Sequence, residues 1–275
     1  MSVKQQGYGD YLYKIALYGT LVVLLAMALL PFIYALSISF RPYSEVFGTV
    51  HWIPKNPTLD PWRTAFSDLA TPLKNSFLIA TGTAVLSLII TIPGAYVFGR
   101  KQFPGKDIAF YAIIVALLFP YILLIVPIVD IWNDFGLYNT IPGLWLAYQV
   151  FVTPFAIWIL RDFFEGLPDN IEEAAQVYGC TQFSAFLRVI LPLSMPAIIA
   201  VGFISFLVGW NDFLFANMLT TGSGPRPAVV QLFISTTGGE QTSWALLMAE
   251  TILIGTPPTI LYMISRRYLG NAFAT

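Results

Sequence analysis

Six long apolar stretches, separated by polar ones, dominate the pattern of hydrophobic and polar positions along the chain. Each is about 20 residues or longer, enough for a helix that rises 1.5 Å per residue to cross a hydrocarbon layer ~30 Å thick. The first stretch contains Ala26-Met27-Ala28, which resembles a signal-peptidase site, but it continues to Ile38 and is too long for a signal core. The pattern therefore predicts an all-α integral membrane protein with spans at about 15–40, 75–98, 108–129, 141–160, 193–215 and 244–264.

The polar connections between these stretches differ in length and composition. Residues 41–74 are rich in proline and residues 218–243 in Thr, Gly and Ser, which predicts two sizeable loops outside the membrane. A short basic turn at 100–106 and a segment of mixed polarity at 168–192 connect other spans. The predicted organisation is a polar N-terminus at 1–14, a six-helix membrane domain at 15–268 and a tail at 269–275.

The composition supports a membrane protein and excludes several other classes. Hydrophobic residues make up 57% of the chain and charged residues 11%, whereas soluble domains carry roughly 25% charged residues. A net charge of −1 gives no electrostatic basis for binding nucleic acid. Cys180 is the only cysteine and His51 the only histidine, so no internal disulfide is possible. No metal site and no catalytic residue are predicted.

The distribution of Lys and Arg predicts how the chain is oriented. Six spans place both termini on one side of the membrane, and the basic residues on that side are Lys4, Lys14, Arg100, Lys101, Lys106, Arg161, Arg188, Arg266 and Arg267. The basic residues on the other side are Arg41, Lys55, Arg63, Lys74 and Arg226. Because cytoplasmic loops carry the excess of basic residues, both termini and the 168–192 segment are predicted to be cytoplasmic, in the cell membrane.

The segment 168–192, between the predicted fourth and fifth spans, has the sequence features of a short helix with defined ends. Asp169 followed by Glu172 resembles a capping box at a helix start. Gly179 stands where a helix end commonly needs a left-handed residue. A second short helix is predicted to begin at Thr181, and Pro192 to break it before the next apolar stretch.

The same segment resembles the EAA loop of importer-type ABC transporter permeases. That loop has Glu-Ala-Ala, then Gly, an aliphatic residue and Leu-Pro at fixed spacing, and the matching residues here are Glu173, Ala174, Ala175, Gly179, Val189, Leu191 and Pro192. In that family the loop forms a coupling helix that docks on a cytoplasmic ATPase subunit. The resemblance implies that these residues, together with Glu172, couple this chain to an ATPase. An amphipathic connector without a partner is the alternative.

The resemblance extends over nearly the whole chain, to the maltose-transporter type of carbohydrate-uptake permease. The matching stretches are Asn75-Ser76-Phe77, Phe103-Pro104-Gly105-Lys106, Gly136-Leu137-Tyr138-Asn139-Thr140, Arg161-Asp162-Phe163-Phe164 and Trp210-Asn211-Asp212-Phe213. It implies a second, homologous permease subunit, two ATPase subunits and an extracytoplasmic solute-binding protein. ATP and Mg would be bound by the ATPase partner, because this chain has no phosphate-binding loop; it is predicted to bind no cofactor and to be no enzyme.

Two acids lie inside the predicted spans, where a charge costs roughly 2.5–3.5 kcal/mol. They are Asp212 and Glu250, and Trp210 and Asn211 precede Asp212 directly. Aromatic faces, carboxylates and amides commonly hold sugars, so these four residues are the candidate substrate pathway. The alternative is that both acids lie at the membrane interface or bond to a neighbouring helix.

The sequence therefore predicts the permease subunit of an ABC importer, for a sugar or oligosaccharide, that works by alternating access. The same machinery with a different solute is one alternative. A secondary transporter or channel is another, but it predicts inverted repeats or several buried ionisable groups, and the sequence shows neither.

Overall fold

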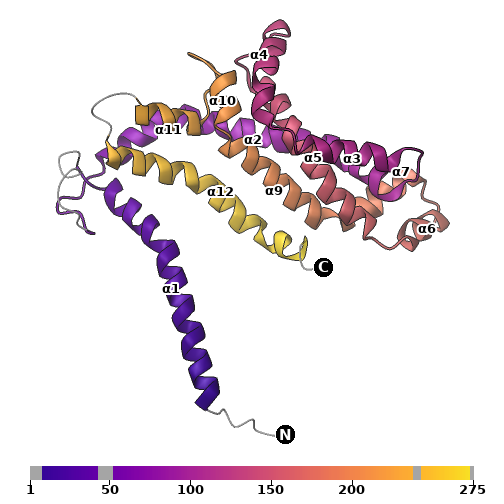
Figure 1. Cartoon of the computed structure of the whole chain (residues 1–275), viewed down its shortest axis with the longest axis horizontal. Helices are drawn as coiled ribbons and strands as arrows, with labels where there is room; N and C mark the ends of the chain where they lie inside the picture. The colour runs from indigo at the N-terminus through magenta and orange to yellow at the C-terminus, as the bar shows by residue number, and fades with distance from the viewer. Residues whose placement is uncertain (1–7, 43–51, 238–242, 273–275) are drawn as a thin grey trace. The chain divides into compact units, whose positions relative to one another are not determined.

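The computed structural model describes residues 8–42, 52–237 and 243–272, and in these residues every regular element is a helix (Figure 1). The all-α prediction is confirmed. The elements are α1 (Tyr8–Ser39), α2 (Asp60–Arg100), α3 (Lys106–Ala116), the 3-10 helix η2 (Tyr121–Leu124), α4 (Ile125–Asp134), α5 (Ile141–Glu165), α6 (Asn170–Val177), α7 (Gln182–Ala185), the π-helix η3 (Phe186–Ile190), α8 (Leu191–Leu193), α9 (Met195–Asn211), α10 (Leu214–Leu219), α11 (Ala228–Thr237) and α12 (Trp244–Ala272).

Four helices are long and apolar enough to cross a membrane by themselves: α1, α2, α5 and α12. Two further candidates are pairs of helices joined at a sharp bend, one of 88° at Lys106–Ala116 and Tyr121–Asp134, the other of 73° at Gln182–Leu193 and Met195–Asn211. The described residues therefore contain between four and six candidate membrane spans.

The first bend falls inside the stretch predicted as a span at 108–129. Pro120 has no N–H to donate to the carbonyl of Ala116, four residues earlier, and its ring crowds that carbonyl. The helix accordingly ends at Ala116, and the amide of Phe119 donates to the Ala116 oxygen at 3.3 Å in a turn. Pro127 lies within the first turn of α4, where a missing N–H is tolerated.

Helix α2 begins at Asp60, well inside the stretch 41–74 that the sequence indicated as a loop. The amide of Asp60 donates to the Thr58 hydroxyl at 3.2 Å, and Pro61 occupies the first turn, which suits its fixed φ. With 41 residues the helix is about 60 Å long, twice the thickness of a hydrocarbon layer. It therefore extends well beyond the span predicted at 75–98.

The chain divides into two compact units, residues 1–67 with 235–253, and residues 68–234 with 254–275. In the first unit, the end of α1 is fastened to the start of α2. The indole N–H of Trp62 donates to the Ser39 hydroxyl at 3.2 Å, and its ring lies 5.6 Å from that of Phe40. The amide of Thr58 donates to the Phe40 carbonyl at 2.8 Å.

In the second unit, small residues allow helix backbones to touch. A Cβ on Gly209 of α9 would lie 3.0 Å from the Cα of Ala80 on α2, and a Cβ on Gly99 would lie 3.0 Å from the Arg161 carbonyl oxygen on α5. Ala80 and Ala95 are fully buried. Small residues therefore lie where α2 packs closely against α5 and α9.

Candidate functional site

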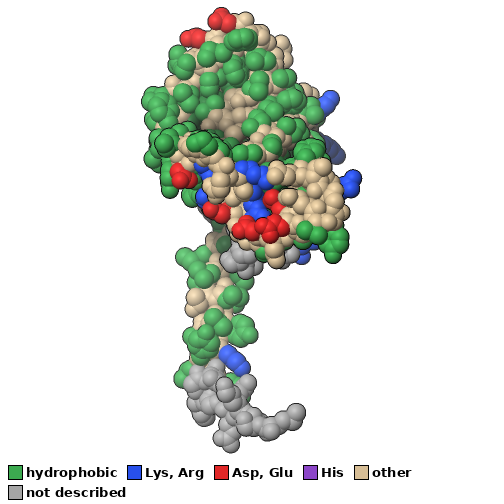
Figure 2. Space-filling view, turned by 90° about the vertical axis from the view of Figure 1, so that its right-hand side faces the viewer, with side chains coloured by type: hydrophobic (Ala, Val, Ile, Leu, Met, Phe, Trp, Pro, Cys, Tyr) green, Lys and Arg blue, Asp and Glu red, His purple; other side chains and the backbone are tan. Residues whose placement is uncertain are grey.

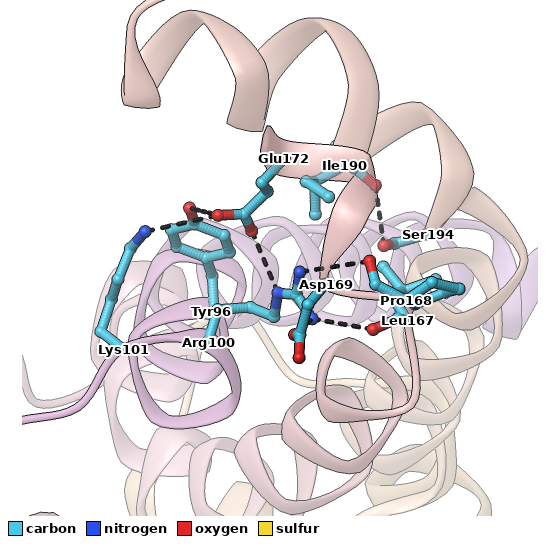
Figure 3. A network of polar contacts seen from close by, with 9 residues as sticks. All are labelled: Tyr96, Arg100, Lys101, Leu167, Pro168, Asp169, Glu172, Ile190 and Ser194. Atoms are coloured by element: carbon cyan, nitrogen blue, oxygen red, sulfur yellow. Dashed lines mark hydrogen bonds and ion pairs between the residues drawn. The ribbon is translucent and has the colours of Figure 1, made fainter. Parts of the chain in front are cut away.

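The residues predicted to couple the chain to a partner lie on α6 and the elements after it, which form one end of the second unit (Figure 1). The space-filling view of that end shows acidic and basic side chains gathered together, bordered by apolar ones (Figure 2). Polar contacts at the base of α6 account for part of this charge cluster (Figure 3).

The predicted capping box at the start of α6 is wrong. Asp169 precedes the helix but its carboxylate makes no capping bond to the backbone. It accepts instead from Arg100, with 2.8 Å between Oδ1 and the guanidinium NH1. Glu172 also turns towards Arg100, at 3.0 Å between Oε1 and Nε. Both carboxylates therefore bind the end of α2 rather than the amides of their own helix.

Arg100 forms the centre of this arrangement (Figure 3). Besides the two carboxylates, its NH1 donates to the Leu167 carbonyl at 2.8 Å and its NH2 to the Pro168 carbonyl at 3.4 Å. These four acceptors lie between residues 167 and 172, on the connector from α5 and the first turn of α6. A planar guanidinium with several donors in fixed directions thus sets both the position and the orientation of that connector.

The Arg100–Glu172 pair is largely shielded from solvent, with side chains 5% and 11% exposed. Glu172 has two further donors on its Oε2 atom, the Tyr96 hydroxyl at 3.3 Å and the Lys101 ammonium at 3.4 Å. Removing one partner from an isolated buried pair typically costs about 3–5 kcal/mol, because the remaining charge is left without compensation. In this site Lys101 would still compensate Glu172, and Asp169 would still compensate Arg100, so the cost is smaller. We refer to Tyr96, Arg100, Lys101, Asp169 and Glu172 as the α2–α6 clamp.

Lys101 keeps its positive charge in the clamp. Burial lowers the pKa of its ammonium, but the contacts with Tyr96 and with the Glu172 carboxylate together outweigh this and raise the pKa above its ordinary value. The contact therefore stabilises the fold at neutral pH and is lost only as the pH rises through that raised pKa. The ammonium also lies 5.1 Å from the centre of the Tyr96 ring.

The clamp rests on an aromatic core that holds the Tyr96 ring in place. The ring meets Phe164 of α5 edge-on at 5.9 Å and Phe186 of η3 at 4.5 Å. Phe164 is fully buried, and Ile190 packs in the same cluster. The base of the α6 loop is therefore packed against α2 and α5 as well as bonded to α2.

The end of α6 has the conformation that the sequence predicted. Gly179 has a φ of +88°, in the left-handed region. Its amide donates to the Gln176 carbonyl at 2.9 Å, and the amide of Cys180 donates to the Ala175 carbonyl at 3.0 Å, which is the Schellman pattern of a helix end. Thr181 then caps α7 through its hydroxyl, which accepts from the Ser184 amide at 3.2 Å.

The chain bends two residues later than predicted. Pro192 lies in the first turn of α8, a position that tolerates proline, and the break comes at Ser194. Ser194 is fully buried, and its hydroxyl donates to the Ile190 carbonyl at 2.8 Å. Leu191 is half-buried and Pro192 is exposed.

The side of the loop away from the clamp carries a surface of mixed character. Glu173 and Ala174 are exposed, whereas Ala175 is buried. Large apolar side chains are exposed next to them in sequence, and these are Val177 (85%), Tyr178 (89%), Phe183 (71%) and Leu187 (44%). Val177 and Tyr178 lie outside the candidate spans, whereas Phe183 and Leu187 belong to Gln182–Leu193, the first half of a bent candidate span. Exposed apolar side chains of this size beside a short polar helix suit a binding surface for another protein. We call Glu173, Ala174 and these four residues the α6–α7 tip.

The candidate substrate residues have structural contacts of their own. Trp210 is 1% exposed and stacks on Phe206 at 5.6 Å, while Asn211 is exposed. The Asp212 carboxylate accepts from the Ala216 amide at 3.1 Å and so begins α10. In the other unit Glu250 is fully buried and accepts from the Ser235 hydroxyl at 3.3 Å. That these residues line a substrate pathway stays a prediction.

Sequence reasoning missed the role of Tyr96, Arg100 and Lys101, and treated the two basic residues only as markers of topology. A signal was present in α6 itself. Glu172 and Ala175 are three residues apart and share a helix face, and that face is the buried one. A carboxylate on a buried face needs a cation nearby, and the basic turn that begins at Arg100 was the nearest cluster of unassigned cations.

Comparisons with known proteins agree with this architecture. Residues 91–274 match the family described as binding-protein-dependent transport system inner membrane component. The trehalose transport system permease protein SugB of Mycobacterium tuberculosis (strain CDC 1551 / Oshkosh) is 34% identical over 92% of this chain and 92% of that protein. The diacetylchitobiose uptake system permease protein NgcG of Streptomyces coelicolor (strain ATCC BAA-471 / A3(2) / M145) is 32% identical over 74% of this chain and 68% of that protein.

A solved structure shares the fold. A chain of a bacterial ABC transporter involved in the import of the acidic polysaccharide alginate superposes with a TM-score of 0.83, over 97% of this chain and all of that one, at 20% sequence identity. The family match spans more than half of the chain and includes the clamp and the α6–α7 tip. This chain therefore belongs to the family of inner membrane components of binding-protein-dependent transport systems.

Proposed function

We propose that this chain is the membrane permease subunit of an ATP-driven importer for a sugar or oligosaccharide. Its family consists of inner membrane transport components, and the two relatives described above are permeases for trehalose and for diacetylchitobiose, both of them sugars. Candidate membrane spans throughout the described residues suit a multi-pass subunit. We propose no enzymatic activity and no bound cofactor for the chain itself.

The observation that carries the coupling part of this proposal is the α6–α7 tip. A short helix outside the candidate spans is held at its base by the clamp, while Glu173 and several large apolar side chains further along the loop are exposed. This arrangement suits a coupling helix that docks on an ATPase subunit, with Glu173 as a partner for a cation there. The coupling residues are then Glu172 to Ala175, Gly179, Leu191 and Pro192.

The proposed topology has six spans, with each bent pair counted as one. Both termini and the loop at 168–192 are then cytoplasmic, and the membrane domain occupies 15–268 between an N-terminus at 1–14 and a tail at 269–275. The excess of Lys and Arg on the side of the termini supports this orientation.

The proposed assembly contains a second, homologous permease, two ATPase subunits that bind ATP and Mg, and an extracytoplasmic solute-binding protein. ATP binding closes the ATPases, and the docked α6 loops convert that motion into opening of the permease pair to the outside. This is a two-state switch that nucleotide binding biases. Trp210, Asn211, Asp212 and Glu250 are proposed to lie along the solute pathway.

The proposed function predicts which activities need a partner. We expect the purified chain alone to hydrolyse no ATP, and the assembled complex to hydrolyse ATP faster when a sugar-loaded binding protein is added. Hydrolysis is measured by phosphate release, and uptake with radiolabelled trehalose and diacetylchitobiose in proteoliposomes. Vanadate-sensitive hydrolysis by the chain free of other subunits would contradict the proposal, and uptake driven by an ion gradient without ATP would indicate a secondary transporter.

The proposed topology predicts opposite labelling of two exposed positions. In a Cys180→Ser background, we expect Phe103→Cys to react with a membrane-impermeant maleimide only after the cytoplasmic side is opened. We expect Pro57→Cys to react in intact cells, because Pro57 is exposed in the predicted outer loop. Total alkylation after solubilisation controls for expression. The reverse pattern would overturn the orientation.

A further inference from the structure

We infer that Arg100 is a positioning residue that makes α6 and the end of α2 move as one body, so that a displacement of α6 is passed to α2. This rests on the proposed function, in which α6 is the element that a partner moves. It goes beyond that function because it assigns the transmission to a particular helix and a particular side chain. The α2–α6 clamp carries the inference.

The contacts of Arg100 connect two elements that are far apart in sequence. Nε and NH1 bind Glu172 and Asp169 at 3.0 and 2.8 Å, on α6 and at its start. NH1 and NH2 bind the carbonyls of Leu167 and Pro168, which follow α5. One guanidinium therefore holds α6 and its connector, and because the acceptors lie in different directions, α6 can neither rotate nor slide on α2 without breaking at least one contact.

The clamp is balanced in charge and closed to solvent at its centre. Arg100 and Lys101 supply two positive charges, and Asp169 and Glu172 supply two negative ones. The Arg100 side chain is 5% exposed and Glu172 11%. Asp169 is 95% exposed and Lys101 32%, so the shielding applies to the Arg100–Glu172 pair. A compensated, shielded pair resists local opening better than an exposed ion pair, for which the contribution is about 0–1 kcal/mol. A load on α6 is thus expected to move α2 before it opens the clamp.

Neighbouring acids on α6 have different roles in this arrangement. Glu172 faces inwards into the clamp, whereas Glu173 is exposed on the α6–α7 tip. Successive residues of a helix point about 100° apart, so one turn of α6 presents one carboxylate to α2 and the next to a partner. Docking and transmission therefore depend on different side chains and can be separated by mutation.

The direct test measures whether α6 and the end of α2 move together. Spin labels on the native Cys180, just beyond α6, and on Phe103→Cys, just beyond α2, report the distance between the two elements in the complete transporter in lipid. With Arg100 present, we expect a narrow distribution of distances between the two labels, with the same mean without nucleotide and with bound ATP. With Arg100→Gln, we expect a broader distribution that changes when ATP binds.

The functional test uses the same transporter. We expect Arg100→Gln to retain its ATPase subunits and to hydrolyse ATP, with uptake at least tenfold lower and hydrolysis no longer stimulated by the loaded binding protein. Arg100→Lys keeps the charge but cannot reach all four acceptors, so we expect intermediate uptake. Arg161→Gln is the matched control, since among the described residues the ion pairs of Arg161 are with Asp162 and Glu165 on its own helix. Its contact with another helix is with the Phe110 ring of α3 at 4.7 Å, which involves neither α2 nor α6, and we expect the variant to leave uptake unchanged.

Three results would overturn the inference, and a fourth would separate it from the docking proposal. A native distance that changes on ATP binding, or an Arg100→Gln transporter with a narrow distance and normal uptake, would overturn the inference. Loss of the ATPase subunits in Arg100→Gln would also overturn it, because Arg100 would then shape the docking surface and not transmit motion. If Glu173→Ala leaves docking and uptake intact while Arg100→Gln broadens the distance distribution, the proposal that the α6–α7 tip docks on an ATPase fails. The inference that Arg100 makes α6 and α2 move together is then still supported.

Discussion

Gly179→Val is expected to reduce solute uptake at least tenfold while the protein still inserts into the membrane. Gly179 has a φ of +88°, which a β-branched residue resists strongly. No atom lies within 4 Å of the position a Cβ would take, so the cost arises from the backbone and not from a clash. Relief of that strain breaks the Gln176 and Ala175 carbonyl contacts that end α6, and the α6–α7 tip loses its shape.

Gly179→Asn provides the matched control. Asparagine adopts left-handed conformations far more readily than valine, and the space around Gly179 accommodates its side chain. We expect this variant to retain most of the native uptake. Glu173→Ala tests the same surface without altering the backbone, and we expect it to weaken retention of the ATPase, by a few kcal/mol if the carboxylate is buried in that interface. Uptake and ATPase retention at native levels in both Gly179→Val and Glu173→Ala would remove the main support for a coupling element.

Asp212→Asn and Glu250→Gln are expected to reduce uptake about tenfold or more at limiting substrate, with normal assembly. A hydrogen bond to a charged group contributes about 1.5–3 kcal/mol, and 1.4 kcal/mol corresponds to a factor of ten. Both amides keep an oxygen in place of the carboxylate. The Ala216 amide and the Ser235 hydroxyl therefore still find an acceptor, and the local structure is preserved.

Two further variants separate a structural role from a transport role. Asp212→Ala removes the acceptor that begins α10, and we expect it to lower thermal stability, which Asp212→Asn leaves unchanged. Ser235→Ala removes the donor to Glu250 and serves as the corresponding comparison in the other unit. Native uptake in both Asp212→Asn and Glu250→Gln would show that the two acids serve only the fold.

Local chemistry made the end of the α6 loop predictable. Gly179 and Thr181 act on backbone groups within a few residues, through a left-handed turn and a hydroxyl cap, and both behave as the sequence indicated. Pro120 could also have been placed at a helix end by the same reasoning. The apolar stretch from 108 to 129 indicated a span by its length, and length alone does not report a bend.

The start of the same loop was not predictable from its own residues. Asp169 and Glu172 match a local capping pattern, but both carboxylates bind the guanidinium of Arg100, more than 60 residues earlier, instead of the backbone amides of α6. A charged donor makes a stronger hydrogen bond to a carboxylate than a neutral backbone amide does. The shared face of Glu172 and Ala175 indicates that Glu172 needs a cation but does not identify which one, so only the fold could show that Arg100 reaches α6.

Contact between helix backbones in the second unit also indicates which residues of this chain determine how its helices pair. In a membrane, a leucine or isoleucine finds much the same apolar surroundings beside lipid as beside another helix, so bulky side chains discriminate poorly between neighbours. Gly209 packs against Ala80, and Gly99 packs against α5. These contacts select the neighbouring helix by shape, since a larger side chain at either glycine would keep that helix away. The information that selects partners for α2 therefore resides largely in its smallest residues, although more than half of the chain is hydrophobic.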